Sequence, residues 1–251
     1  MRFVLSFVVA SITALATCGV TSARADDQAL SAKQQDAVKQ LIHDYLVEHP
    51  DAIVDAIQTL RERDRIAAQD AAKKAVVDRK KDLYEDPNSQ VFGNPNGDVT
   101  VVEFFDYHCP YCKAMTDSVL DIVHTDGKVR LVMKELPILG PDSVFAARAA
   151  IASRYQHLYP EFHTALMHLK GPLNEGSVMQ TAASVGLDID RLKKDMRGAD
   201  VGAVIDANLG LARALSVDGT PGWVLGEKLT SGAMSPQAFK QMIDDARKPK
   251  T

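Results

Sequence analysis

The chain contains only three cysteines, and two of them form its single C-x-x-C motif, Cys109-Pro110-Tyr111-Cys112. A structural zinc site needs about four ligands, but the chain has no second cysteine pair, and its seven histidines are scattered without ligand-like spacing. Covalent haem attachment needs a histidine directly after the motif, where this chain has Lys113. We therefore expect neither a metal nor an organic cofactor.

The chain also lacks an excess of basic residues. Its formal net charge is −4, whereas proteins that bind nucleic acids normally present a basic patch, so we expect no nucleic-acid partner. The hydrophobic fraction of 46% and the charged fraction of 25% are globular values. A core can therefore form without several disulfides, and 251 residues leave room for one ordinary domain and an appendage.

Long apolar runs are absent except near the N-terminus, where Phe3–Ala16 is too short for a confident transmembrane helix. Arg2 precedes this run, and Ala23-Arg24-Ala25 supplies an A-x-A cleavage signal. This combination predicts a signal peptide over residues 1–25 and a soluble mature protein in the periplasm. Disulfides form and persist in such an oxidising compartment.

Cys18 leaves a second interpretation of the N-terminus open. Leu15-Ala16-Thr17-Cys18 is close to a lipoprotein signal, in which Cys18 would carry the lipid. Thr17 is unusual before such a cysteine, and the A-x-A site fits well, so we favour soluble cleavage. The mature protein would then keep only Cys109 and Cys112.

The C-x-x-C motif lies between a predicted buried strand, Val99–Phe105, and a helical pattern. Pro110 suits the first turn of that helix, because its missing N–H loses no hydrogen bond there. Cys109 would then lie at the positive helix end, which favours the thiolate form. A structural disulfide here would close a very small loop and stabilise little. The pattern indicates a thiol–disulfide exchange site formed by Cys109 and Cys112.

Three segments in order carry a family resemblance. Glu103 to Cys112 (EFFDYHCPYC) resembles the active-site segment of the DsbA-like thiol–disulfide oxidoreductases, which have a thioredoxin fold. Glu135 to Ala150 and Gly219 to Gly226 resemble the next segments of the Com1/ScsC-type branch. The resemblance covers residues 86–248, approximately the whole chain after its N-terminal third. It implies an α/β thioredoxin fold over residues 86–251.

Thr220-Pro221 precedes a short apolar segment. By itself this pattern favours an ordinary turn proline at the start of a strand. The resemblance implies instead the cis-proline loop of the family, since X-Pro bonds are the ones that adopt cis readily. The loop would approach the cysteines, and the backbone of Thr220 would pair with an extended substrate.

Glu103 interrupts an apolar strand six residues before Cys109. That offset matches the buried glutamate of DsbA-like proteins, which implies a carboxyl group with a raised pKa that exchanges protons with Cys112. The resemblance also implies Lys134 as the charge partner of Glu103. The alternative for both residues is a solvent-facing position at a strand edge.

Two residues beside the cysteines complete the candidate site. His108 would stabilise a neighbouring thiolate if it is cationic, or would simply face solvent. Pro110 and Tyr111 form the dipeptide that tunes the redox poise of the pair. By resemblance, a Pro-Tyr pair is seen in isomerase-type relatives and favours an isomerase or reductase over a strong oxidase.

Residues 26–85 differ in composition from the rest of the chain and predict a helical arm. Val38, Leu41, Ile42, Tyr45 and Leu46 form one apolar helical stripe. An isolated arm needs a partner for this stripe, either its own domain or another protomer. The resemblance favours a homo-oligomer through residues 26–82. We expect Arg61 to Asp82 to be a solvated helical spacer.

The rest of the chain alternates strand and helix patterns. Residues 86–97 (DPNSQVFGNPNG) predict a loop, and a helical subdomain is expected at about residues 140–217, inserted between the two halves of the fold. Further strands are expected at Lys128–Leu136, Pro221–Leu225 and Lys228–Thr230, and a closing helix at Pro236–Ala246.

These patterns predict an exported protein disulfide isomerase or reductase that acts on extracytoplasmic proteins with cysteines. A membrane reductase would keep it reduced. The first alternative is a dithiol oxidase that works as a monomer and is reoxidised by a quinone-linked membrane partner. The second is a copper-binding module that uses His108, Cys109 and Cys112. The third is a holdase chaperone whose arm forms a cleft.

Overall fold

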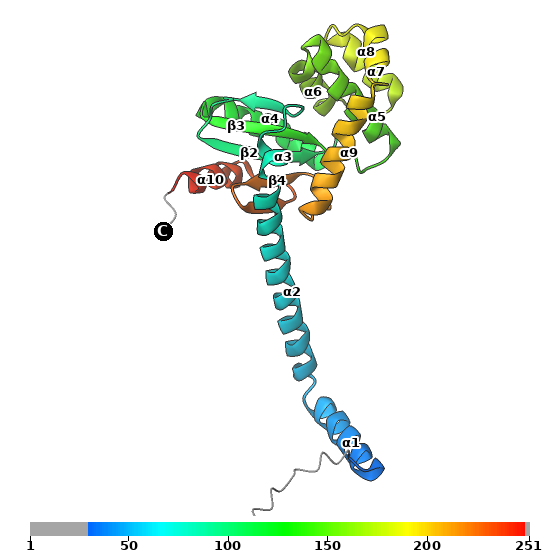
Figure 1. The fold of residues 1–251 in the computed structure, drawn as a ribbon, viewed down its shortest axis with the longest axis vertical. Coiled ribbons are helices and arrows are strands. Elements are labelled where there is room, and N and C mark those ends of the chain that lie inside the picture. Colours follow the sequence, from blue (N-terminus) through cyan, green and yellow to red (C-terminus); the bar gives the residue numbers. More distant parts are fainter. Residues whose placement is uncertain (1–29, 249–251) are drawn as a thin grey trace, which may run out of the picture. The chain divides into compact units, whose positions relative to one another are not determined.

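The computed structural model describes residues 30–248 (Figure 1). It divides into two compact units, with the boundary between Thr59 and Leu60. The predicted signal segment, residues 1–25 with Cys18, lies outside the described residues. Within the described range, no helix combines the length and the apolar character needed to cross a membrane.

The N-terminal unit contains α1 (Ala32–Glu48) and the beginning of α2 (Asp51–Asp78). A capping box starts α1, because Ser31 Oγ accepts from Gln34 N and the Gln34 side chain accepts from Ser31 N at 2.9 Å. No residue of α1 is buried. Most of its large apolar residues are exposed, and so are those of the first turns of α2: Val38, Leu41, Ile42, Tyr45, Val47, Ile53, Val54 and Ile57. Leu46 is half-buried.

The second unit is built on a five-stranded sheet in the order β1-β3-β2-β4-β5. The strands are β1 (Gln90–Gly93), β2 (Val99–Phe105), β3 (Val129–Glu135), β4 (Gly222–Leu225) and β5 (Lys228–Ser231). β2 and β3 are parallel, and the other neighbours are antiparallel. Nearly all residues of the central strands are buried, as expected for strands covered on both faces.

The alternation of side chains along β2 divides the core into two parts. Val101 and Phe105 belong to a core cluster with residues of α4 (Pro110–Asp126) and α10 (Pro236–Arg247). Val102 and Phe104 belong to the opposite cluster, with residues of α9 (Ala199–Ala214). Glu103 shares the parity of Val101 and therefore lies on the face covered by α4.

A block of helices lies between β3 and β4 in the chain, as the sequence predicted. It consists of α5 (Pro141–Ser153), the 3₁₀ turn η1 (Arg154–Gln156), α6 (Tyr159–Met167), α7 (Glu175–Ser184), α8 (Ile189–Asp195) and α9. Figure 1 shows α5 to α8 gathered together beside the sheet, with α9 leading back to it. The observed architecture is thus the predicted α/β fold with an inserted helical subdomain.

Two sequence-based predictions about the N-terminal part of this unit are wrong. Residues 86–97 are not a simple loop, because β1 forms within them and pairs with β3. β1 has only four residues and lies among Pro, Asn and Gly residues. These residues are typical of turns, so the sequence predicts a loop where the strand forms. The segment Arg61–Asp82 is not wholly solvated either: Val76 is buried and belongs to the core cluster that contains Val102 and Phe104. α3 (Lys80–Tyr84) adds the buried Leu83 to this cluster.

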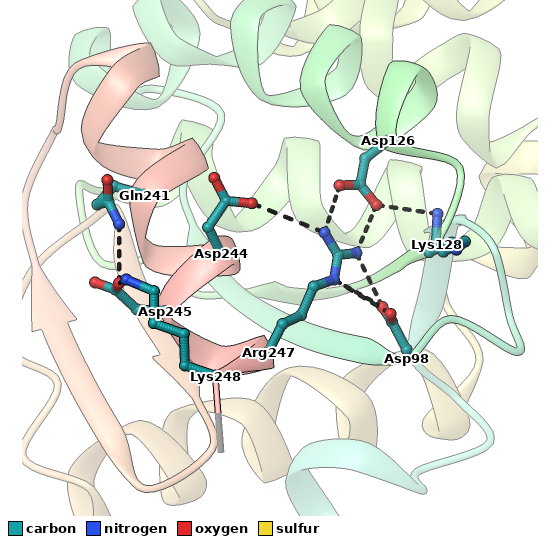
Figure 2. A network of polar contacts seen from close by, with 8 residues as sticks. All are labelled: Asp98, Asp126, Lys128, Gln241, Asp244, Asp245, Arg247 and Lys248. Atoms are coloured by element: carbon teal, nitrogen blue, oxygen red, sulfur yellow. Dashed lines mark hydrogen bonds and ion pairs between the residues drawn. The ribbon is translucent and has the colours of Figure 1, made fainter. Parts of the chain in front are cut away.

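Arg247 holds the end of α10 beside two loops (Figure 2). Its guanidinium donates to Asp98 at 2.9 Å and to Asp126 at 2.6 and 2.7 Å. These carboxylates lie just before β2 and at the end of α4, so one side chain joins three elements. α4 ends beside this network at Gly127, whose left-handed conformation (φ 66°) favours glycine.

Replacement of Arg247 by Gln is expected to lower the free energy of unfolding by about 1 kcal/mol at low salt, because two forked ion pairs are lost at a partly exposed site. The loss should shrink at high salt. Chemical denaturation of both proteins at two salt concentrations measures it. Lys248→Gln is the control, since Lys248 forms an ion pair with Asp245 three positions earlier on the same helix end, and it should leave the transition unchanged. Equal effects of the two variants would contradict a clamping role for Arg247.

Candidate active site at the cysteine pair

Cys109 is the N-cap of α4, with extended backbone angles (φ −72°, ψ 117°), and Pro110 opens the helix. The backbone N–H of Cys109 donates to Asp106 O at 3.0 Å, so a main-chain hydrogen bond closes the turn before the helix. Both thiols of the motif are free, and both residues are buried. The two side chains interact, since Cys109 is among the groups that raise the thiol pKa of Cys112. The two sulfurs therefore lie together at the positive end of α4.

Thr220 reaches the cysteine pair from the other half of the fold. The Cys109 Sγ–H donates to Thr220 O at 3.3 Å, across 111 positions of sequence. The Thr220-Pro221 peptide bond is cis. It lies just before β4, which pairs with β2, so the sheet brings this loop to the start of α4. The alternative of an ordinary turn proline does not hold.

Glu103 lies beneath the inner cysteine on the buried face of β2. The residue is 6% exposed, and burial raises the pKa of its carboxyl group to about 8. Cys112 is buried as well, and its thiol pKa is raised, first by burial and then by the negative charge of Glu103. The two groups therefore interact electrostatically. A proton taken from Cys112 has an acceptor nearby whose pKa lies close to neutral.

The expected charge pairing of Lys134 with Glu103 is wrong. The parallel register places Lys134 beside Phe104 and Glu103 beside Met133, so the two charged side chains lie on opposite faces of the sheet. Lys134 is 1% exposed, and its ammonium donates to Asp86 Oδ2 at 2.8 Å and Asp82 O at 2.7 Å. It joins the segment before β1 to the sheet, away from the cysteines.

The other two predicted flanking residues face solvent. Tyr111 is 63% exposed, between the cysteines in sequence. His108 is exposed too, and its backbone N–H donates to Asp106 Oδ1 at 2.7 Å. Neither side chain is packed, so both remain accessible to a substrate.

Sequence reasoning overlooked Asp106, which organises the turn before the motif. It is 1% exposed, and Oδ2 accepts from Ile138 N at 2.9 Å and Leu139 N at 3.0 Å, while Oδ1 accepts from His108 N. Its position directly after a buried strand and before Cys109 was the available signal. One carboxylate thus joins the cysteine loop to the segment after β3.

Among residues 30–248, no group of three or more His, Cys, Asp or Glu side chains is arranged to hold a metal ion. In this range a soft metal would therefore depend on the two thiols alone. Two thiols at a helix N-terminus, with a carboxyl group below and a backbone carbonyl opposite, suit exchange with a disulfide.

Two family profiles match the chain. The profile of the DSBA-like thioredoxin domain matches residues 100–244, and that of the copper resistance protein ScsC N-terminal domain matches residues 34–67. The first match spans the sheet from β2 to β5 and the helical insertion. The second covers most of α1 and the first half of α2.

Solved structures show the same likeness. A thioredoxin-like oxidoreductase from Silicibacter pomeroyi is 46% identical, covering 68% of this chain and 98% of that one, with a TM-score of 0.66. Proteus mirabilis ScsC in a transitional conformation is 27% identical, covering 87% and 97%, with a TM-score of 0.64. A periplasmic thioredoxin-like protein from Salmonella enterica is 28% identical, covering 66% and 94%, with a TM-score of 0.61.

Curated relatives include an Na(+)/H(+) antiporter NhaA 1 from Salinispora arenicola, 30% identical over 167 residues. This alignment covers 64% of the chain but only 25% of the antiporter. The chain thus spans about a quarter of the length of the first curated relatives it matches. The profile over residues 100–244 spans more than half of the chain and contains Cys109, Cys112 and Thr220. On this basis the protein belongs to the DSBA-like thioredoxin domain family, with a ScsC-type N-terminal segment.

Proposed function

We propose that this member of the family is an exported protein disulfide isomerase and reductase that uses Cys109 and Cys112. The observation that carries the isomerase assignment is the exposed apolar stripe of the N-terminal unit. A dithiol oxidase that works as a monomer has no use for such a surface, whereas an assembly with several active sites can hold one substrate at two of them. The Pro110-Tyr111 dipeptide supports the same direction.

In the proposed reaction, the Cys109 thiolate attacks one sulfur of a substrate disulfide. A new bond forms between Cys109 and that sulfur, and the other substrate sulfur leaves as a thiolate and takes up a proton. In isomerisation, a different substrate thiolate attacks the mixed disulfide, forms a new substrate disulfide and releases Cys109 as a thiolate. No net electrons are transferred in this cycle.

In the reductase branch, Cys112 attacks the Cys109 sulfur of the mixed disulfide. The substrate leaves reduced, and Cys109 and Cys112 become a disulfide that a membrane reductase must reduce again. Glu103 would accept the proton of Cys112 during this attack. The same groups would run in the opposite direction with a quinone-linked oxidase as the membrane partner.

Thr220 would align the substrate. Its carbonyl oxygen, which accepts from the Cys109 Sγ–H in the free protein, would accept instead from the backbone N–H of an extended peptide. Main-chain pairing of this kind does not depend on the side chains of the substrate. A catalyst that acts on many different proteins needs such a mode of binding. The proposed clients are extracytoplasmic proteins with cysteines, and the proposed location is the periplasm, which rests on the predicted signal peptide.

Self-association through the stripe on α1 is the part of this proposal that distinguishes isomerase from oxidase. Leu41 is 69% exposed and Ile42 is 54% exposed. α1 has no buried residue to hold it against a neighbouring element. Exposed apolar surface of this extent normally marks an interface, and a second copy of the chain offers a matching apolar stripe.

Leu41→Lys is expected to dissociate the assembly and to abolish the recovery of activity from a scrambled-disulfide test protein. Burial of the ammonium group in an apolar contact costs at least about 3 kcal/mol, which weakens association by more than a hundredfold. Sedimentation measures the association, and refolding of the test protein measures isomerase activity. Oxidation of a reduced peptide by the variant should stay unchanged, because the cysteine site is intact.

The matched control is Gln40→Lys, which adds the same charge one position away. Gln40 lies on the polar side of α1, where its amide contacts Asp44, so this variant should associate and rescue normally. Truncation is a weaker design, since removal of residues 26–82 would also delete the core residue Val76. If wild-type protein oxidises the peptide but never rescues the scrambled protein, the oxidase alternative replaces our proposal.

A further inference from the structure

A chain of buried polar side chains lies between the cysteine loop and α6. The Tyr107 hydroxyl and His163 Nδ1 are 3.0 Å apart, and the Tyr159 hydroxyl donates to Glu135 Oε1 at 2.5 Å. The Tyr107 and Tyr159 side chains also interact with one another, and the Tyr159 ring stacks on the His163 ring with the centroids 5.8 Å apart. All four residues are buried, with exposures of 1–3%. We call Tyr107, Tyr159, His163 and Glu135 the Tyr107 network.

Two hydrogen-bonding groups of this network keep one protonation state over the physiological pH range. Burial lowers the pKa of His163 to about 3, so its imidazole is neutral. Burial also raises the pKa of Tyr107 well above its ordinary value, so its phenol keeps its proton. The rings of Phe92 and Phe105 lie 5.2 and 5.0 Å from the His163 ring. The bond between Tyr107 and His163 is therefore a permanent, dry contact, which suits a positioning role better than proton transfer.

Tyr107 stands two positions before Cys109, inside the turn that Asp106 organises. The Asp106 carboxylate ties this turn to Ile138 and Leu139, whereas the Tyr107 side chain ties it to α6, 56 residues later. The turn closes with the bond from Cys109 N to Asp106 O. The position of Cys109 opposite Thr220 therefore depends on both anchors.

We propose that Tyr107 is a positioning residue for Cys109, held in place by His163 and Tyr159 of α6, so that the helical insertion sets how well the reactive sulfur meets a disulfide substrate. This inference rests on thiol–disulfide exchange by Cys109 and is independent of the choice between isomerase and oxidase. Disulfide exchange needs three sulfurs in line beside the Thr220 loop. Alkylation by a small reagent needs only an accessible thiolate.

The test compares two rates of the Tyr107→Phe variant, which keeps the ring and loses the hydroxyl. Both rates are measured at a pH where ultraviolet absorbance shows Cys109 to be fully thiolate. Exchange with a peptide disulfide should fall about tenfold, below the roughly hundredfold that a full ångström of misplacement costs. Alkylation by iodoacetamide should stay within about twofold, because it has no alignment requirement.

Tyr84→Phe is the matched control. Its hydroxyl donates to Gly226 O at 2.9 Å, at the opposite end of β4 from Pro221, so both of its rates should equal those of wild type. Tyr159→Phe provides a second test and remains decisive if Tyr107→Phe does not fold. It should lower exchange selectively, and the double variant should be no slower than Tyr107→Phe, since the hydroxyls act as one unit.

A ratio of exchange to alkylation that stays at the wild-type value in both variants would overturn the inference. An equal fall of both rates together with lower thermal stability would also overturn it, because it would show a purely structural role. Failure of the proposed function looks different: wild-type protein itself would then not exchange with the peptide disulfide, although iodoacetamide still alkylates it.

Discussion

Cys109→Ala should abolish thiol–disulfide exchange, whereas Cys112→Ala should still react once and then stop as a mixed disulfide with its substrate. Cys109 occupies the N-cap of α4, and its sulfur lies 3.3 Å from the Thr220 carbonyl oxygen, in the loop where we propose that the substrate pairs. Cys112 lies one turn inside, and burial together with the charge of Glu103 raises its thiol pKa. The first attack therefore belongs to Cys109, and Cys112 acts only after it.

Mass spectrometry of each variant with a peptide disulfide distinguishes these outcomes. Cys112→Ala should accumulate an adduct one peptide heavier than the protein, and added reductant should remove it. Cys109→Ala should show no adduct over the same time. A stable adduct on Cys112 in the Cys109→Ala variant would reverse the two roles. Full suppression of client aggregation by Cys109→Ala would instead support the holdase alternative.

Much of this site could be predicted from the sequence because its parts are local. A strand, a C-x-x-C motif and a helix opened by Pro110 follow one another directly, so periodicity and capping rules suffice. The family resemblance identified Glu103 by its offset from Cys109, and the structure buries it. Thr220 and Pro221 come from far along the chain and could be placed only through the family resemblance.

The errors have physical causes that a single sequence hides. Pairing of Lys134 with Glu103 depends on the register between β2 and β3, because a shift of one residue moves a side chain to the other face. β1 was missed because its four-residue strand pattern is weaker than the turn signal of the Pro, Asn and Gly residues around it. Val76 is one buried position in an otherwise charged helix. Tyr107 and His163 meet only through the docking of α6, and nothing near either residue in the sequence indicates the other.

Glu103→Gln should make the protein more stable relative to wild type as the pH rises. The folded-state pKa of about 8 lies above the ordinary value of 4.5, so the folded protein keeps a proton that the unfolded chain loses in this window. The free energy of unfolding of wild type therefore falls as pH rises from 4.5 toward 8. Glutamine has no such titration. The unfolding free energy of the variant minus that of wild type, here called the gap, should grow by roughly 3 kcal/mol between about pH 5 and about pH 8.

Urea denaturation at several pH values measures the difference in unfolding free energy between the variant and wild type. Its change with pH is the decisive quantity. Its size at a single pH also contains the cost of leaving the glutamine amide without hydrogen-bond partners. Glu85→Gln is the control, because it makes the same change at a residue that is exposed. A flat gap for Glu103→Gln would mean that the carboxyl group reaches water and is ionised at little cost.

The same variant should be the slower enzyme. Without a carboxylate to accept the proton of Cys112, attack on the mixed disulfide at about pH 8, where roughly half of Glu103 is ionised, should slow by about a hundredfold, the lower end of what general acid–base catalysis provides. Formation of the mixed disulfide by Cys109 should change little, since its sulfur contacts Thr220 rather than Glu103. The buried Glu103 destabilises the fold, and its role in speeding the attack of Cys112 would explain why it is there. If Glu103→Gln gained stability and resolved the mixed disulfide at the wild-type rate, Glu103 would have no part in proton transfer, and its burial would need another reason.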